Sequence, residues 1–136
     1  LIVHRKGSTR AFGPGNSELW STYKETGQPV IIGGSMETGS ALLVGTTRAE
    51  DETFSSTAHG SGRTMSRTQA KREVRGDQLQ KEMEKKGIYV RAVSMSGLAE
   101  EAGLAYKNLP DVIDACAKAG ISKPVCLLMP KGNVKG

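Results

Sequence analysis

The clearest strand pattern of the sequence lies in Pro29-Val30-Ile31-Ile32-Gly33-Gly34-Ser35-Met36-Glu37-Thr38-Gly39-Ser40-Ala41-Leu42-Leu43-Val44. Its two short apolar runs, residues 29–32 and 41–44, are bounded by glycines, as buried strands often are. The small and polar residues between them, 33–40, indicate a loop. We therefore expect two neighbouring strands joined by a loop whose backbone can come close to a ligand.

The rest of the chain predicts a mixture of strands and helices around these two strands. On the N-terminal side we expect a strand at Leu1–Val3, a basic turn at Arg5–Arg10 and a surface loop over residues 13–28. On the C-terminal side, capping and apolar periodicity predict a helical turn at 50–54, helices at 66–75, 77–86, 97–106 and 109–119, strands at 88–93 and 124–129, and a tail from Gly132. We expect Ser66 to begin one helix, and Gly87 and Gly120 to end two others. Strands and helices do not alternate regularly, so the fold class is α+β, with mixed sheet strands and surface helices.

Composition is that of one folded domain with an excess of positive charge. The chain has 136 residues, with 19 Lys and Arg against 14 Asp and Glu, which gives a net charge of +5. A basic balance favours polyanionic partners such as nucleic acid. The alternative is that these charges only form solvated helix faces. Glycine is abundant at 17 residues and aromatic residues make up 4%, so tight turns are favoured over extensive base stacking.

The cysteine pattern and the hydropathy favour a cytoplasmic protein. Cys116 and Cys126 are too few for a disulfide framework, and we see no signal peptide or membrane span. We expect both cysteines to be buried free thiols rather than a disulfide or a metal pair. No Walker-type phosphate loop, dinucleotide fingerprint or metal-ligand constellation appears. The chain begins within an apolar run without Met, and we expect it to be a fragment.

His59 is the residue best suited to carry chemistry. It lies in Ser56-Thr57-Ala58-His59-Gly60-Ser61-Gly62-Arg63, where small neighbours let a ligand approach the backbone. Successive N–H groups in such a turn can bind phosphate oxygens, and Arg63 adds a forked cationic donor. A neutral imidazole can attack phosphorus and form a phosphoramidate. The alternative is an ordinary structural loop. We expect His4, in a strand beside basic residues, to be structural or a neighbour of phosphate.

Several separated blocks together resemble one family, the RtcB-type RNA ligases, which join RNA ends in tRNA splicing and RNA repair. The blocks that carry the resemblance are residues 3–12, 27–30, 34–36, 54–60, 62–63, 65–67, 105–108 and 134–136. The resemblance runs along the whole chain but corresponds to the C-terminal portion of the family's catalytic domain. It implies that RNA 3′-phosphate or 2′,3′-cyclic phosphate ends are joined to 5′-hydroxyl ends through a GMP–histidine intermediate, with GTP and Mn²⁺ required.

The resemblance also implies roles for particular residues. His59 matches the histidine that attacks the α-phosphorus of GTP. Gly33, Gly34, Ser35, Met36 and Ser40 match the nucleotide loop, Gly60, Ser61 and Gly62 match the segment beside the nucleophile, and Tyr106 and Lys135 match residues that border the guanine. Lys6, Arg63 and Arg67 fall where the family presents cations to GTP or RNA phosphates. The expected partners are RNA, GTP and the remainder of an RtcB chain, with no membrane.

Three departures from the family pattern stand out. Glu37 replaces a usual Gly, which we expect to place a negative charge beside the nucleotide loop. Ser61 replaces a usual Ala and could add a hydrogen bond. The family's manganese ligands precede the matched segment, so we expect them in an N-terminal metal-binding portion that this sequence does not include. The fragment alone should then be inactive. The competing hypothesis is a non-catalytic module that binds RNA or phosphate.

Overall fold

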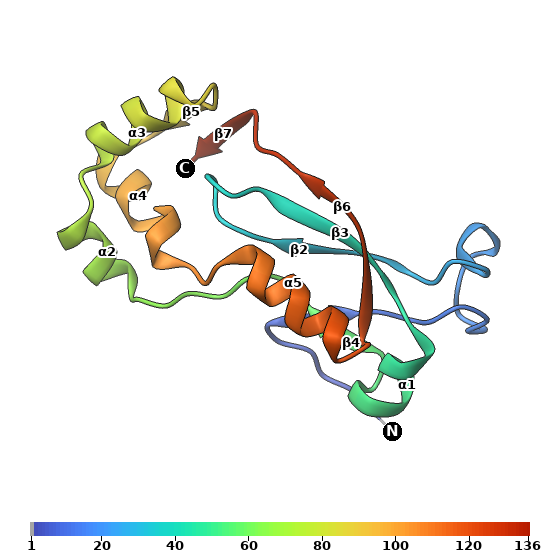
Figure 1. The fold of residues 1–136 in the computed structure, drawn as a ribbon. Helices are drawn as coiled ribbons and strands as arrows, with labels where there is room; N and C mark the ends of the chain where they lie inside the picture. The colour runs from blue at the N-terminus through green and yellow to red at the C-terminus, as the bar shows by residue number, and fades with distance from the viewer. Residues whose placement is uncertain (1) are drawn as a thin grey trace.

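The computed structural model describes residues 2–136 as an α+β fold, which confirms the expected class (Figure 1). The elements in order are β1 (Ser8–Arg10), the 3₁₀ turn η1 (Ser21–Tyr23), β2 (Pro29–Gly33), β3 (Ser40–Gly45), α1 (Thr47–Thr53), β4 (Ser56–Ala58), α2 (Arg67–Glu73), α3 (Gly76–Lys85), β5 (Tyr89–Ala92), α4 (Met95–Glu100), the 3₁₀ turn η2 (Gly103–Ala105), α5 (Leu109–Lys118), β6 (Ser122–Leu128) and β7 (Gly132–Lys135). Within residues 2–136, none of the helices is long and apolar enough to cross a membrane.

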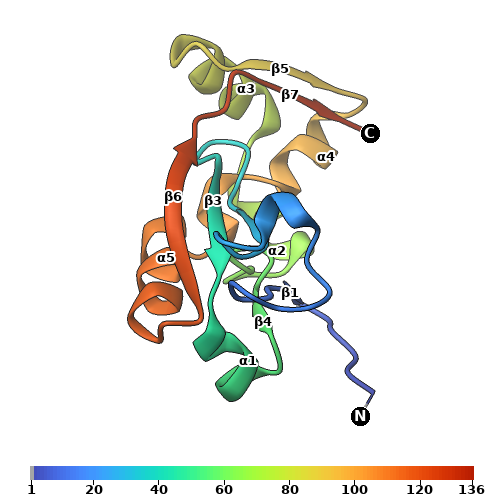
Figure 2. The ribbon, with the colours of Figure 1, turned by 90° about the vertical axis from the view of Figure 1, so that its right-hand side faces the viewer.

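The central element is an antiparallel sheet in the order β2-β3-β6, with α5 against one face (Figures 1 and 2). Side chains on a strand alternate between faces, and the register opposes Val30 to Leu43 and Ile32 to Ala41. These four side chains are buried against α5. The complete core cluster is Ala11, Val30, Ile32, Ala41, Leu43, Leu109, Ile113 and Cys116.

The opposite face of this sheet stays open in the part of the chain that the structure describes. Ile31 is 55% exposed there and Val125 57%. Cys126 pairs with Leu42, whose side chain lies on the open face, and is exposed as a free thiol. The expectation that Cys126 is buried was therefore wrong, because a strand-like run does not tell which face a helix covers. Cys116 is a buried free thiol, as predicted.

A second core lies where α3 and α4 pack beside the parallel pair β5 and β7 (Figure 2). Its buried residues are Met36, Leu79, Met83, Ile88, Val90, Leu98 and Ala102. Leu79 and Met83 are four residues apart on one face of α3, as their spacing predicts. Met36 belongs to the loop between β2 and β3, so that loop is anchored in the second core although its strands form the first.

Two sequence predictions near the N-terminus were wrong. The expected strand at Leu1–Val3 lies partly outside the described residues, and Ile2 and Val3 are not in a strand. His4, expected in that strand, is likewise outside any strand. The strand forms instead at Ser8–Arg10, within the expected basic turn, because these residues pair with β4. Such pairing with distant residues leaves no local pattern.

The C-terminal half shows both confirmed and mistaken boundaries. Ser66 caps α2 by accepting a hydrogen bond from the Gln69 N–H, and Gly87 and Gly120 follow α3 and α5 with positive φ, as predicted. The helix expected at 97–106 is instead two pieces, α4 and η2. The Gly103 N–H donates to a Glu37 carboxylate oxygen at 2.6 Å, rather than continuing a helical ladder. The expected tail from Gly132 is β7, because it pairs with β5.

Two adjacent isoleucines of β2 test the assignment of the two sheet faces. Ile32 is fully buried and Ile31 is 55% exposed. We expect Ile32→Ala to lower the free energy of unfolding by about 2–5 kcal/mol, since it leaves a cavity in the core. The control Ile31→Ala should cost about 1 kcal/mol or less. Urea denaturation of the 136-residue chain measures both, and equal losses would contradict the assignment.

Candidate functional site

His59 follows directly after β4, and that strand begins with a strained turn. Phe54 and Ser55 both have positive φ, 52° and 54°, which costs about 1–3 kcal/mol for each non-glycine residue. Arg5 holds this turn, because its guanidinium donates to the Phe54 carbonyl and to the Ser56 hydroxyl, both at 2.8 Å. Arg5 therefore positions the strand that carries His59, a role that the sequence pattern did not reveal.

A buried pair of hydroxyls fixes β4 against the central sheet. The Thr57 and Ser122 hydroxyls lie 3.0 Å apart, and their residues are 2% and 1% exposed. A buried hydroxyl that loses its partner costs about 1–3 kcal/mol. This contact therefore fixes the position from which the chain enters the His59 turn.

Backbone hydrogen bonds join the His59 turn to the end of β2. The Gly33 N–H donates to the His59 carbonyl at 3.1 Å, and the Ser61 N–H donates to the Gly33 carbonyl at 2.7 Å. Gly33 and Gly60 thus form an isolated parallel bridge. The two glycine-containing segments that the sequence singled out separately lie side by side in the structure.

The loop after Gly33 is a compact turn closed by its own groups. The Ser35 N–H donates to the Thr38 hydroxyl at 2.9 Å, and the Ser35 hydroxyl accepts from the Thr38 N–H at 3.2 Å. A Cβ at Gly34 would lie 2.6 Å from the Gly39 carbonyl oxygen, and one at Gly39 would collide with the Leu128 backbone. The loop therefore requires both glycines. The Ser35 hydroxyl, expected to contact a nucleotide, is buried within the turn and stabilises it.

Met36 and Glu37 turn away from this loop toward the helical side of the molecule. The Met36 side chain is buried in the second core, and its carbonyl accepts from the Asn133 amide at 3.1 Å. The Glu37 carboxylate accepts from the Gly103 N–H and lies 3.8 Å from the Lys86 ammonium. The negative charge expected beside the nucleotide loop is thus held by a backbone donor and a cation.

A cleft of about 370 Å³ lies beside this loop and contains five of the residues assigned to the nucleotide site. They are Gly34, Ser35, Met36, Ser40 and Lys135. The remaining walls come from the segment that joins β6 to β7. Lys135 lies 99 residues after Met36 in the sequence. The two line the same cleft because Lys135 belongs to β7, which pairs in parallel with β5.

The Arg63 guanidinium makes most of its contacts with other groups of the protein. Its guanidinium donates to the Met65 carbonyl at 3.1 Å, to the Glu100 carbonyl at 2.6 Å and to the Tyr106 hydroxyl at 3.1 Å. It also lies 4.8 Å from the centre of the Tyr106 ring. A phosphate bound by Arg63, as expected from the sequence, would therefore contact a guanidinium that also holds Tyr106 in place.

Glu101 is the residue of this region that the sequence pattern did not reveal. Its carboxylate accepts a short hydrogen bond from the Tyr106 hydroxyl and lies 3.6 Å from Arg63, 3.7 Å from Arg67 and 3.8 Å from Lys135. Four of the assigned residues thus meet at one carboxylate that is 20% exposed. In the sequence, Glu101 is one of two adjacent acids in a helical pattern, which gives no sign of this role.

This environment changes the titration of Tyr106. Burial, followed by the hydrogen bond to the Glu101 carboxylate, raises the pKa of the Tyr106 phenol above its ordinary value of 10.0. The nearby Arg63 guanidinium acts in the opposite direction. Tyr106 therefore stays protonated at neutral pH, as a donor fixed in one direction.

A second cleft, of about 730 Å³, lies between the Gly60–Gly62 turn and the start of α5, and Gly7 also lines it. The Ser61 hydroxyl is buried and has no hydrogen-bond partner among residues 2–136, so the expected extra hydrogen bond is not made within the described chain. Lys6 is exposed next to Gly7. Arg67 keeps 67% of its side chain exposed, so it and Lys6 remain accessible to phosphate.

The His59 side chain is exposed, and the structure assigns it no hydrogen bond or ion pair with residues 2–136. The same residues contain no cluster of three or more His, Cys, Asp or Glu side chains that could hold a metal ion. The described side chains therefore do not fit a manganese site. They do offer an open imidazole beside two backbone turns.

Known proteins resemble the whole of this chain. The sequence pattern of the family described as tRNA-splicing ligase RtcB matches residues 1–136. A "tRNA-splicing ligase RtcB" of Archaeoglobus fulgidus is 57% identical over all 136 residues, which are 28% of that protein, and one of Pyrococcus abyssi is 52% identical over a segment that is 15% of its length. An "RNA-splicing ligase RtcB homolog 2" of Entamoeba dispar is 50% identical over 135 residues. The chain thus spans well under a third of these relatives.

Replacing Glu101 by Gln tests whether this carboxylate controls Tyr106. Without the negative charge, the pKa of Tyr106 should fall, since a carboxylate beside a phenol disfavours the phenolate. Tyrosinate absorbance at rising pH measures the change, and Tyr106→Phe identifies which of the three tyrosines responds. Glu52→Gln, at an exposed position on α1, is the matched control. An unchanged Tyr106 titration in the Glu101 variant would contradict the assignment.

Proposed function

This chain belongs to the tRNA-splicing ligase RtcB family, and we propose that it is the C-terminal portion of an RNA ligase catalytic domain. The proposed reaction joins RNA 3′-phosphate or 2′,3′-cyclic phosphate ends to 5′-hydroxyl ends, in tRNA splicing and RNA repair. His59 carries GMP, taken from GTP, as the covalent intermediate. The relatives' names support the RNA-ligase class, and the site's geometry supports the role of His59.

The observation that carries the proposal is the backbone bridge between Gly33 and Gly60. It places the backbone of His59, whose side chain is exposed, next to the end of β2, and Lys135 is one of the residues that line the cleft beside the loop that follows. Small residues expose backbone N–H groups to phosphate oxygens, and a lysine adds positive charge at the other end. A nucleotide bound along this cleft would therefore present its phosphates toward the histidine turn.

In the proposed step, a neutral imidazole nitrogen of His59 forms a bond to the α-phosphorus of GTP. The bond between the α-phosphorus and the bridging oxygen breaks, and pyrophosphate leaves with that electron pair. The imidazole proton on the other nitrogen passes to solvent, to which the exposed ring has access. A 2′,3′-cyclic phosphate end is first opened by water to the 3′-phosphate. An oxygen of the RNA 3′-phosphate then attacks the phosphorus of the adduct, and the bond between that phosphorus and the His59 nitrogen breaks. The 5′-hydroxyl oxygen of the second RNA end attacks the phosphorus of the 3′-phosphate, its proton passes to solvent, and GMP leaves with the electron pair of the broken bond.

Tyr106, Lys135 and Glu101 supply the proposed guanine end of the site. The Tyr106 hydroxyl and the Lys135 ammonium share the Glu101 carboxylate, so both are held in one place before a base arrives. Preorganised polar groups lose less freedom on binding, and this favours affinity and selectivity. Glu101 is thus a positioning residue in this proposal.

The proposed requirement for Mn²⁺ has to be met outside residues 2–136, since their side chains do not fit a metal site. The relatives extend far beyond the matched segment, which covers 14–28% of their length. We therefore place the ligands in an N-terminal metal-binding portion and assign no step of the reaction to the metal. A bound manganese ion would supply Lewis acidity and orientation at phosphate.

The His59 assignment is tested with a full-length protein that contains this segment. Incubation with GTP labelled in its α-phosphate and with Mn²⁺ should leave label on the wild-type protein, and His59→Ala should reduce that label at least about 100-fold, as expected for loss of a nucleophile. His4→Ala is the matched control, because it removes the only other histidine of the segment. Undiminished labelling of the His59→Ala protein would contradict the assignment of His59 as the nucleophile.

RNA binding by the full-length protein distinguishes this proposal from a non-catalytic RNA-binding module. The isolated 136-residue chain should not label itself on either hypothesis, because residues 2–136 contain no cluster of side chains that could hold manganese. A simple binding module would bind RNA with an affinity that falls steeply with salt and ignores GTP, even at full length. Efficient self-labelling by the isolated chain would refute the placement of the metal ligands elsewhere.

A further inference from the structure

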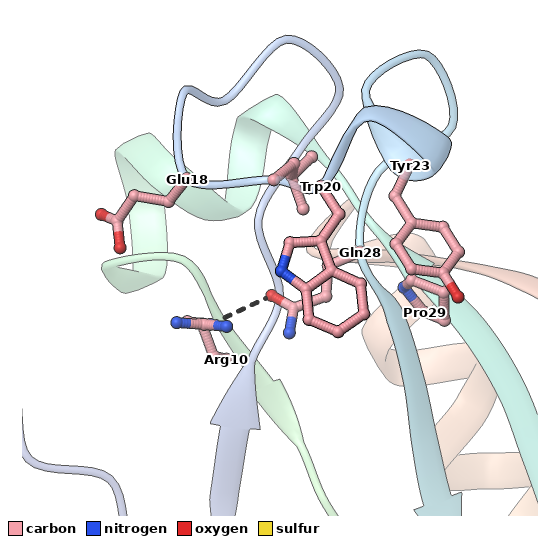
Figure 3. A pocket seen from close by; sticks show the side chains of 7 residues that line it. Arg10, Glu18, Trp20, Tyr23, Gln28 and Pro29 are labelled. Carbon is pink, nitrogen blue, oxygen red and sulfur yellow. Dashed lines mark hydrogen bonds between the residues drawn. The ribbon is translucent and has the colours of Figure 1, made fainter.

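A cleft of about 250 Å³ lies below η1, and none of its lining residues is among those expected to bind the nucleotide. Figure 3 shows the Trp20 and Tyr23 rings projecting from the same loop, with Gln28 and Pro29 beneath them and the Arg10 guanidinium beyond Gln28. Trp20 is the single tryptophan of the chain and is 79% exposed. An exposed tryptophan beside a cation is a common feature of binding surfaces.

The polar groups of this cleft are held in fixed directions. The Gln28 amide oxygen accepts from the Phe12 N–H at 3.2 Å and from Arg10 Nε at 3.3 Å. The amide NH₂ of Gln28 is therefore turned away from these partners. The Arg10 guanidinium also lies 4.7 Å from the centre of the Phe12 ring. Its two terminal nitrogens have no hydrogen-bond partner among residues 2–136, so they can donate to a ligand.

The β1–β4 ladder connects this cleft to the histidine turn. Arg10 pairs with Ser56 at one end of the ladder, and Ser8 pairs with Ala58 at the other, next to His59. His59 is three positions after Ser56, a distance of roughly 10 Å at about 3.3 Å per residue. The exposed Lys6 precedes β1 at the His59 end. Cations therefore occur at both ends of one short strand.

From this arrangement we propose that the Trp20 cleft binds an unpaired RNA base close to the end being joined. The base stacks on the Trp20 indole, with Tyr23 at the edge of the cleft, and Arg10 contacts an adjoining phosphate. Stacking on an aromatic side chain accepts any base, and arginine supplies a forked donor for phosphate. This inference rests on the proposed RNA-ligase function and adds a contact for the RNA strand itself.

The charge pattern favours RNA over a protein partner at this cleft. Arg10 is held in place by contacts with Gln28 and Phe12, whereas Glu18, the acid that lines the cleft, makes no ion pair with it. The whole chain carries a net charge of +5. Glu18 opposes phosphate, so Glu18→Gln should strengthen RNA binding if a phosphate lies near Arg10.

The test uses a full-length protein that contains this segment and a fluorescein-labelled, single-stranded RNA oligonucleotide with a 3′-phosphate. Fluorescence anisotropy should show that Trp20→Ala weakens binding about 5- to 150-fold, the range for loss of one base–aromatic stack. Trp20→Phe should retain most of the affinity. Arg10→Gln should reduce the slope of the logarithm of affinity against the logarithm of salt concentration by about one, as expected for the loss of one phosphate contact. A blunt RNA duplex should bind equally well to wild type and Trp20→Ala.

The matched control is Tyr89→Ala. Tyr89 is also an exposed aromatic residue beside an arginine, since the Arg91 guanidinium lies 4.5 Å from the centre of its ring. It lies on β5, at the opposite end of the molecule from the η1 loop (Figure 1). Its replacement should leave RNA affinity unchanged, and an equal loss with Tyr89→Ala would overturn the site.

Labelling of His59 by GTP is measured in parallel, because it separates this inference from the proposed function. Trp20→Ala should label normally. Unchanged single-strand affinity, or an equal loss of duplex affinity, overturns the inference whatever the labelling shows. If Trp20→Ala also loses labelling, the comparison of Trp20→Phe with Trp20→Leu shows whether an aromatic ring is needed for RNA binding. Equal affinities of these two variants for the single-stranded RNA would exclude stacking. If the wild type binds RNA through Trp20 but never labels, the proposed function fails and the RNA site stands.

Discussion

The hydrogen bonds that Gly33 makes with the His59 turn are the contacts on which the candidate site depends. They attach the end of β2 to the turn after β4, although these strands belong to different sheets. Backbone groups that are paired in this way hold their positions without any particular side chain. The rest of the candidate site therefore needs only short connections, the loop from Gly34 onward and the turn through Gly62.

The second constraint is electrostatic and lies at Glu101. The Glu101 carboxylate contacts one phenol and three cationic side chains, and it holds the Tyr106 hydroxyl and the Lys135 ammonium near each other. Exposed ion pairs contribute little to stability, but this carboxylate is mostly buried and its partners form a network. The backbone bridge and the carboxylate network thus hold two parts of the candidate site. The cleft is lined by Gly34, which follows the bridged Gly33, and by Lys135, which lies beside Glu101.

Local sequence patterns predicted those parts of the fold that depend on local physics. The two strands at 29–32 and 41–44, the Ser66 cap and the glycines after α3 and α5 were predicted correctly, because each depends on neighbours within a few residues. The short strands β1, β4 and β7 were missed, since each forms only by pairing with a distant segment. The break before Gly103 and the roles of Arg5 and Glu101 have the same origin. The exposure of Cys126 could not be predicted either, because it depends on which face α5 covers.

The proposed intermediate is a single covalent bond between His59 and GMP, and its position can be mapped on the protein. After reaction of a full-length protein with GTP and Mn²⁺, trypsin should release residues 49–63, between Arg48 and Arg63, with His59 as the single histidine. We expect mass spectrometry to find a GMP adduct on this peptide, attached to His59, and we expect acid to remove the adduct, as it does a phosphoramidate. An adduct on a lysine or on another peptide, with unmodified His59, would show that His59 is not the nucleophile.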